Sequence, residues 1–134
     1  MKRRTRGSLT PTHVLDTSAV IAYLAQEPGG EQLKTIRRTA ALPFIVITEL
    51  YYVIWRKHEQ TFADRVIQDV LSWRLPLLTA DERLSLSAGY IKSRFQLGLA
   101  DSYIAACALA YEATLVTKDA DFHVLEPDLK CLFL

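Results

Sequence analysis

The sequence predicts an α/β domain built on a mostly parallel β-sheet that is flanked by helices. Five short apolar runs predict strands at residues 13–15, 44–47, 75–78, 114–116 and 130–133. These runs show little polar alternation, which is typical of strands buried on both faces. Segments with helical patterning fill the gaps between them. Strands that alternate with helices imply βαβ units and right-handed crossovers.

The first half of the chain predicts three helices. Residues 18–25 are apolar on most sides, and the Pro-Gly-Gly sequence at 28–30 is a strong stop signal. Residues 31–39 predict a shorter, more charged helix. After the second predicted strand, Thr48 is expected to cap a helix that runs to about residue 58.

Three further helices are expected in the second half. After a break at 59–61, an amphipathic helix is marked by apolar residues at helical spacing: Phe62, Val66, Ile67, Val70 and Leu71. A helix at 81–94 is separated by Gly98 from a last one at 100–112. That last helix has no charged residue from Tyr103 to Tyr111, so we expect it to be central and buried.

Length and composition indicate one globular domain. The chain has 134 residues, half of them apolar and 23% charged, which argues against disorder. No segment reaches the roughly 18 to 20 uninterrupted apolar residues of a membrane span, and the start lacks the apolar core of a secretion signal. We therefore expect a cytoplasmic protein. Cys107 and Cys131 have no CxxC partner and are expected to be buried, reduced thiols.

The positive charge is concentrated at the start of the chain. Net charge is +1, and Lys2, Arg3, Arg4 and Arg6 lie in the first residues, so the remainder carries about −3 by subtraction. We expect a basic flexible tail at 1–11 and a folded domain at 12–134. The tail either adds affinity for phosphates or is only a solvated end, and the second interpretation is preferred.

Acidic residues stand where several predicted elements begin or end. Asp16 follows the first predicted strand, Glu49 lies in the first turn of the helix after the second strand, and Asp101 opens the last helix. Asp119 and Asp121 follow the fourth strand, and one or both belong to the set. In an open parallel α/β sheet these places converge on one crevice at the carboxyl ends of the strands.

Each acid also has a structural interpretation. Asp16 or Glu49 would stabilise the positive end of a helix dipole, and Asp101 would be an N-cap. The two later acids would be turn residues. Thr17 and Ser18 either cap the first helix, which is preferred, or orient Asp16 by hydrogen bonds. A purely structural role can explain any one of these acids, but it explains less well why all of them occur at equivalent positions of the fold.

Crowded carboxylates indicate a divalent cation. They repel one another and become protonated unless a cation compensates, and hard oxygen ligands suit Mg²⁺ or Mn²⁺. The pattern therefore favours metal-assisted phosphodiester chemistry. His13, His58 and His123 lack zinc-type spacing, and no acyl-transfer triad, dinucleotide loop or GxxxxGK loop is present.

Four motifs carry a resemblance to a known family. They are VLDTSA at 14–19, TEL at 48–50, LADSYIAA at 99–106 and LVTKDADF at 115–122. Each is weakly specific, but the ordered set, which extends from about residue 13 to the C-terminus, resembles PIN-domain ribonucleases and specifically VapC-type toxins of toxin–antitoxin pairs. The segment at about 59–94 matches only in pattern, and the basic tail is an addition.

The resemblance implies a fold and a site. The fold is a five-stranded parallel sheet in the order 3-2-1-4-5, and the activity is Mg²⁺- or Mn²⁺-dependent endonuclease action on single-stranded RNA. We expect Asp16 and Asp101 as direct metal ligands, with Glu49 and Asp119 binding directly, through water or at a second ion. Asp121 supports the loop or a second ion. Supporting hydroxyls are expected from Thr17, Ser18 and Thr117.

Three functions remain open at this point. The preferred one is a toxin ribonuclease silenced by a small antitoxin. The others are a housekeeping PIN nuclease in RNA processing and a catalytically idle RNA-binding domain. Retention of all the acids argues against the idle domain, and a short upstream antitoxin gene would favour the toxin.

Partners follow from surface residues. Basic groups are expected to surround the acidic crevice, with six candidates: Arg37, Arg38, Arg56, Lys57, Arg94 and Lys118. The apolar run at 51–55 and the next helix are expected to leave part of a helical hairpin exposed. We expect a homodimer, and an antitoxin that covers this hairpin to form a hetero-oligomer.

Overall fold

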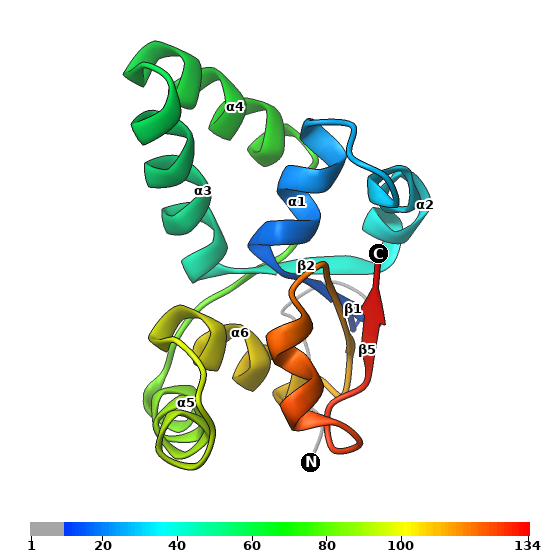
Figure 1. Ribbon diagram of the computed structural model, residues 1–134, viewed down its shortest axis with the longest axis vertical. Coiled ribbons are helices and arrows are strands. Elements are labelled where there is room, and N and C mark those ends of the chain that lie inside the picture. Colours follow the sequence, from blue (N-terminus) through cyan, green and yellow to red (C-terminus); the bar gives the residue numbers. More distant parts are fainter. Residues whose placement is uncertain (1–9) are drawn as a thin grey trace.

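A computed structural model describes residues 10–134 and contains a five-stranded, all-parallel sheet (Figure 1). The strand order is β3-β2-β1-β4-β5, so the predicted order 3-2-1-4-5 is confirmed. In the central first strand, His13 lies opposite Ala40 of the second strand on one side and opposite Thr114 of the fourth strand on the other. The strands are β1 (His13–Leu15), β2 (Ala40–Pro43), β3 (Leu77–Leu78), β4 (Thr114–Thr117) and β5 (Cys131–Phe133).

Helices connect every pair of consecutive strands. Between β1 and β2 lie α1 (Thr17–Leu24), η1 (Gly30–Gln32), α2 (Leu33–Ile36) and η2 (Arg37–Thr39). Next come α3 (Phe44–Lys57) and α4 (Gln60–Ser72), then α5 (Glu82–Arg94) and α6 (Leu99–Ala110). The 3₁₀ segment η3 (Ala120–Leu125) joins β4 to β5. The single helix predicted at 31–39 is thus three short pieces.

The strand order puts helices on both faces of the sheet. The chain moves outward from β1 to β2 to β3 and then returns across the sheet to β4 and β5. With right-handed crossovers, this reversal places α1 and α6 on opposite faces, as Figure 1 shows. The reversal lies between β1 and β4. In such sheets the crevice at this point, beyond the carboxyl ends of the strands, is where ligands bind.

Helix α6 is the most buried helix of the fold. Residues 104–108 are all fully buried, and the helix contacts β1, β2 and β4. Three of these five residues are alanines, which allow the helix backbone to approach the sheet closely. The first turn of α6 is fixed because Ser102 Oγ donates to the Gly98 carbonyl at 2.9 Å. The prediction of a central, buried last helix is confirmed.

The second strand was predicted too late in the chain. It spans Ala40–Pro43, and α3 begins at Phe44, so the predicted strand at 44–47 is wrong. Thr48 is the fifth residue of α3, and the N-cap is Pro43. Val46 and Leu50, four residues apart, are both fully buried, so packing at helical spacing overrides the strand propensity of the β-branched residues. Glu49 therefore lies in the second turn of α3.

Other sequence expectations have simple outcomes. Neither cysteine forms a disulfide within residues 10–134; Cys107 is buried as expected, whereas Cys131 is only half-buried. Within residues 10–134 no helix is long and apolar enough to cross a membrane. Nearly all of the predicted basic tail at 1–11 lies outside the described residues.

Candidate metal centre

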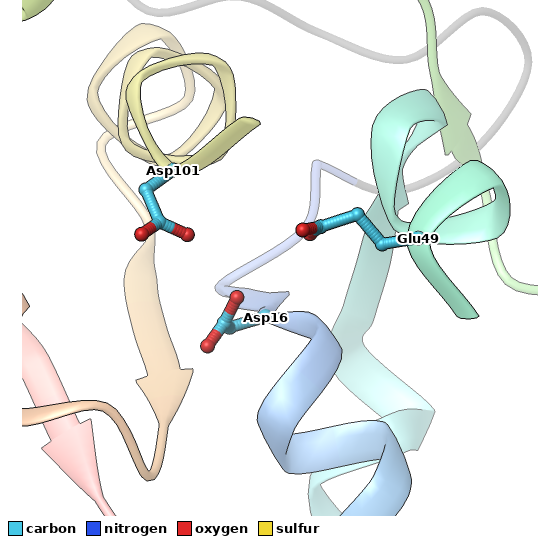
Figure 2. Close-up of side chains that lie close together, drawn as sticks. All are labelled: Asp16, Glu49 and Asp101. Atoms are coloured by element: carbon cyan, nitrogen blue, oxygen red, sulfur yellow. The ribbon is translucent and has the colours of Figure 1, made fainter. Parts of the chain in front are cut away.

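Three carboxylates meet at the carboxyl ends of the strands. Asp16 follows β1, Glu49 comes from the second turn of α3, and Asp101 from the first turn of α6. One carboxylate oxygen from each lies within 4.8 Å of the other two. Figure 2 shows the three side chains directed into the same space from three separate elements. The structure therefore brings together three of the five acids named from the sequence.

Asp16 is held in place by two hydroxyl groups. Its Oδ2 accepts hydrogen bonds from Ser18 Oγ at 2.6 Å and from Thr117 Oγ1 at 2.7 Å. These hydroxyls in turn accept backbone N–H groups of the segment after β4, Lys118 N to Ser18 at 2.9 Å and Asp119 N to Thr117 at 2.9 Å. Asp16 is only 3% exposed. The orientation of its carboxylate is thus fixed jointly by the ends of β1 and β4.

These contacts decide between the interpretations left open for the start of α1. Asp16 occupies the N-cap position, yet no side-chain hydrogen bond caps the helix. Ser18 orients Asp16, and Thr17 Oγ1 donates to Glu49 Oε1 at 2.8 Å. The preferred capping interpretation of Thr17 and Ser18 is therefore wrong, because both hydroxyls are committed to acids of the cluster.

Burial, together with nearby negative charges, raises the pKa values of all three acids. Burial raises the pKa of Asp16 against the opposing effect of the Ser18 and Thr117 hydrogen bonds, and burial also raises the pKa of Glu49. The pKa of Asp101 rises to about 7, first through burial and then through the nearby charges of Asp16, Asp119, Glu49 and Asp121. The cluster therefore favours either bound protons or a bound cation.

The donor set fits a hard divalent cation. All three side chains offer oxygen, and no nitrogen or sulfur ligand belongs to the group. Among residues 10–134 the ion pairs are Lys118–Glu27 and His123–Glu126, neither of which neutralises the cluster. Oxygen-only coordination is what Mg²⁺ and Mn²⁺ prefer.

Asp119 and Asp121 lie close to the cluster but outside it. Asp119 is the N-cap of η3, and its Oδ1 accepts the Asp121 N–H at 2.9 Å. Asp119 is half-buried and Asp121 is exposed. The charges of both contribute to the raised pKa of Asp101, so both act electrostatically on the site.

Two of the basic candidates are far from the acids. Arg37 and Arg38 lie in η2, directly before β2, and so at the amino ends of the strands. The Arg37 guanidinium packs over the rings of Tyr23 and Trp73, 5.5 and 5.2 Å from their centroids. The expectation that these two arginines surround the acidic crevice is not supported, because the acids lie at the carboxyl ends of the strands.

The remaining basic candidates differ in their surroundings. Arg56 and Lys57 end α3, and the Arg56 guanidinium lies 5.0 Å from the Tyr52 ring centroid. Lys118 Nζ pairs with Glu27 Oε1 at 3.0 Å. Arg94 is the last residue of α5. Lys92, in the same last turn, was not predicted from the sequence, because basic residues are common at helix C-termini for dipole reasons alone.

Comparisons with known proteins agree with this fold. The family model described as PIN domain matches residues 13–126. VapBC2 from Rickettsia felis, bound to a promoter DNA fragment, has a similar structure, with TM-score 0.75 and 21% identity over 91% of this chain and 98% of that one. DNA-bound VapBC from Salmonella typhimurium has TM-score 0.77 and 20% identity, over 91% of this chain and 97% of that one. FitAcB from Neisseria gonorrhoeae has TM-score 0.71 and 23% identity, over 90% of this chain and 96% of that one.

At these identities the likeness to solved structures concerns the fold alone. The comparison with curated proteins finds no match. The PIN model, in contrast, spans most of the chain, including the three clustered acids and both hydroxyls that hold Asp16. The protein belongs to the PIN domain family.

Proposed function

We propose that this protein is a divalent-metal-dependent endoribonuclease, the toxin of a type II toxin–antitoxin pair, which cleaves single-stranded regions of cellular RNA in the cytoplasm. The observation that carries the proposal is the convergence of Asp16, Glu49 and Asp101 at the switch point of the sheet. The family and the raised pKa of Asp101 support the same conclusion.

Asp16 and Asp101 are proposed as direct ligands of Mg²⁺ or Mn²⁺. Glu49 binds directly, through water or at a second ion, and Asp119 and Asp121 act from the periphery. A divalent cation at such a site supplies charge neutralisation for the phosphate and an activated water. The chain itself contributes the arrangement, because Thr117 and Ser18 fix Asp16 while Thr17 fixes Glu49.

The toxin assignment is favoured over a housekeeping nuclease by fold similarity to VapBC proteins. It is tested by brief induction of the protein in cells, followed by cleavage-site sequencing of total RNA, with Asp16→Ala as the control. We expect a small set of sharp cleavage sites in single-stranded regions that the control lacks. Identical RNA ends in both samples would contradict the proposal. A short upstream gene whose product suppresses the cleavage would separate the toxin from the housekeeping nuclease.

The hydroxyl of Thr117 gives a first prediction. Thr117→Val keeps the shape of the side chain but removes the hydrogen bond to Asp16 Oδ2, so Asp16 loses part of its fixed orientation. Loss of such an outer contact typically lowers metal affinity about 10- to 100-fold. Isothermal titration with Mn²⁺ measures this loss. Thr114→Val, at the other end of β4, is the matched control and should bind Mn²⁺ like the wild type.

The two acids after β4 give a second prediction. Asp119 is half-buried and follows the strand end directly, so Asp119→Ala should reduce metal-dependent cleavage more than Asp121→Ala. Asp119→Asn removes the negative charge but keeps the hydrogen bond that caps η3, because an amide oxygen can still accept the Asp121 N–H. If cleavage depends on the charge, Asn and Ala at 119 are equally impaired. A larger loss of cleavage from Asp121→Ala would show that Asp121, and not Asp119, is the fourth acid of the site.

The hairpin of α3 and α4 is the proposed partner surface. As the sequence predicted, part of it is exposed: Tyr52 is 41%, Trp55 44% and Phe62 37% accessible. Figure 1 shows this hairpin projecting from the sheet at one end of the molecule. A mostly apolar groove of about 450 Å³ lies between the hairpin and α1, and its apolar lining residues are Ile21, Leu24, Ala25, Val53, Ile54, Phe62 and Val66. A small antitoxin and a second copy of the chain are the proposed occupants of the hairpin surface.

Two measurements test this third prediction. Light scattering of the isolated protein should give the mass of a homodimer, since exposed aromatic residues favour association. Hydrogen exchange in α3 and α4 should slow when the antitoxin is added. A monomer at high concentration, with exchange in the hairpin unchanged by the antitoxin, would contradict both partner assignments.

A further inference from the structure

The connection between α5 and α6 forms an open hollow beside the acidic cluster. The hollow has a volume of about 610 Å³ and is lined by residues 92–98; we name it the α5–α6 hollow. Gly98, at its edge, is the N-cap of α6. A β-carbon placed on Gly98 would lie 3.9 Å from Asp101 Oδ2. One residue of the lining, Gly98, therefore lies close to a carboxylate of the proposed metal site.

The hollow is preformed by contacts of its own lining. Lys92 Nζ donates to the Leu97 carbonyl at 2.7 Å, and this hydrogen bond links the two ends of the segment. The Leu97 side chain is 3% exposed and anchors the loop in the core. The Phe95 N–H donates to the Ile91 carbonyl at 3.0 Å. An ammonium group has three donors, so the bond to Leu97 occupies only one of those on Lys92.

The hollow supplies positive charge where the site needs it. A cluster of carboxylates repels a polyanion, so RNA requires cations next to the cluster. Lys92 and Arg94 lie in the last turn of α5, in the segment that leads into Asp101. Lys57, in contrast, lies eight residues beyond Glu49 along α3, a rise of about 12 Å.

An exposed aromatic ring, just outside the lining of the hollow, adjoins Arg94. Tyr90 is 61% exposed and lies one helical turn before Arg94, whose guanidinium is 5.8 Å from the ring centroid. Aromatic rings next to arginine are typical platforms for unpaired bases, because every base has a face that can stack. A base inside a duplex has no free face, so this combination favours single strands.

We propose that the α5–α6 hollow is a subsite for single-stranded RNA flanking the scissile phosphate. Lys92 and Arg94 contact backbone phosphates there, and Tyr90 stacks on a base. The inference rests on the proposed ribonuclease function and adds the path of the substrate to it. It also gives Lys92 a role that the sequence alone did not suggest.

The test measures RNA binding separately from cleavage. A fluorescent single-stranded RNA of mixed sequence is titrated in the Asp16→Asn background, where the RNA stays intact. The variants are Lys92→Gln, which removes the charge but keeps an N–H donor, together with Arg94→Gln, Tyr90→Ala and Tyr90→Phe. Arg83→Gln is the matched control, because Arg83 is an exposed arginine at the opposite end of the same helix. Thermal melting confirms that each variant is folded.

Each variant has a defined expected result. Lys92→Gln and Arg94→Gln should each lower the affinity about five- to tenfold and reduce the slope of log K against log salt by about 0.7. Tyr90→Ala should lower the affinity about tenfold, while Tyr90→Phe, which keeps the stacking ring, should bind like the parent. Arg83→Gln should change neither the affinity nor the slope.

The possible failures are distinguishable. If the wild type cleaves RNA but all these variants bind RNA like the parent, the subsite is wrong and the ribonuclease stands. If the variants keep RNA affinity but lose dimerisation or antitoxin binding, the hollow is a protein-docking surface and the proposal is overturned. If the wild type neither binds nor cleaves RNA, the ribonuclease function fails and the subsite fails with it.

Discussion

Asp101→Asn is expected to lower metal-dependent RNA cleavage by more than about a hundredfold while leaving the fold intact. The asparagine keeps the shape of the side chain but removes the charge that a divalent cation would neutralise. Asp16→Asn should have an equal effect, because Asp16 supplies another of the three clustered carboxylates. Initial rates of cleavage of a short single-stranded RNA in Mg²⁺ or Mn²⁺ measure the loss.

A control and a stability measurement accompany this variant. Asp128→Asn removes an exposed carboxylate from the loop before β5 and should cleave at the wild-type rate. In metal-free buffer at neutral pH, Asp101→Asn should be more stable than the wild type, since the variant neither buries this negative charge nor suffers like-charge repulsion from the rest of the cluster. Wild-type cleavage by a folded Asp101→Asn protein would show that Asp101 is no metal ligand.

Stability of the metal-free protein should fall as the pH rises from about 4 towards neutrality. The pKa of Asp101 is raised from 3.8 to about 7 in the folded protein, so between these values the folded state binds more protons than the unfolded state. The free energy of unfolding therefore decreases with rising pH in this window, and the loss is complete above about pH 7. Asp16 and Glu49 shift in the same direction and add to the effect.

A bound cation should reverse this destabilisation. At a concentration about a hundredfold above its dissociation constant, a ligand of the folded state adds about 2.7 kcal/mol of stability. Thermal melting from about pH 5 to pH 8 in EDTA should show a falling midpoint, which Mg²⁺ or Mn²⁺ restores mainly at the higher pH. Asp101→Asn should show a smaller fall. A wild-type midpoint that rises steadily with pH in EDTA would contradict the raised pKa values.

The parallel sheet, unlike the order of its strands, follows from features visible in the sequence. Short apolar runs without polar alternation mark β1 and β4 within one residue, and the uncharged stretch before Tyr111 marks the buried helix α6. The order of the strands entered through the family resemblance and is confirmed. The second strand was misplaced because Phe44 to Ile47 are β-branched or aromatic, whereas the burial of Val46 is at helical spacing with Leu50.

The convergence of the acids was predictable, but the way they are held was not. Asp16 and Asp101 follow or begin elements whose ends meet at the switch point, so topology alone brings them together. Glu49 reaches the same point from the second turn of α3, a turn later than expected. The hydrogen bond from Thr117 to Asp16 joins residues 101 positions apart, and no local pattern reports such a contact.

The positions of the basic residues show the same limit. Arg37 and Arg38 were proposed from their charge alone, and the structure puts them directly before β2, at the amino ends of the strands. No sequence pattern distinguishes Lys92, and only the structure shows its hydrogen bond to the Leu97 carbonyl in the segment next to Asp101. Contacts between a side chain and a distant backbone group depend on the folded path of the chain.

The most direct test of the central claim is metal add-back with purified protein. A short single-stranded RNA is incubated with wild-type protein stripped by EDTA, and Mg²⁺ or Mn²⁺ is then restored, with Asp16→Asn treated in parallel. The proposed metal centre predicts no cleavage in EDTA, recovery of cleavage with either cation, and none with Asp16→Asn under any condition. Undiminished cleavage in EDTA, by protein shown to be free of contaminating nuclease, would contradict it.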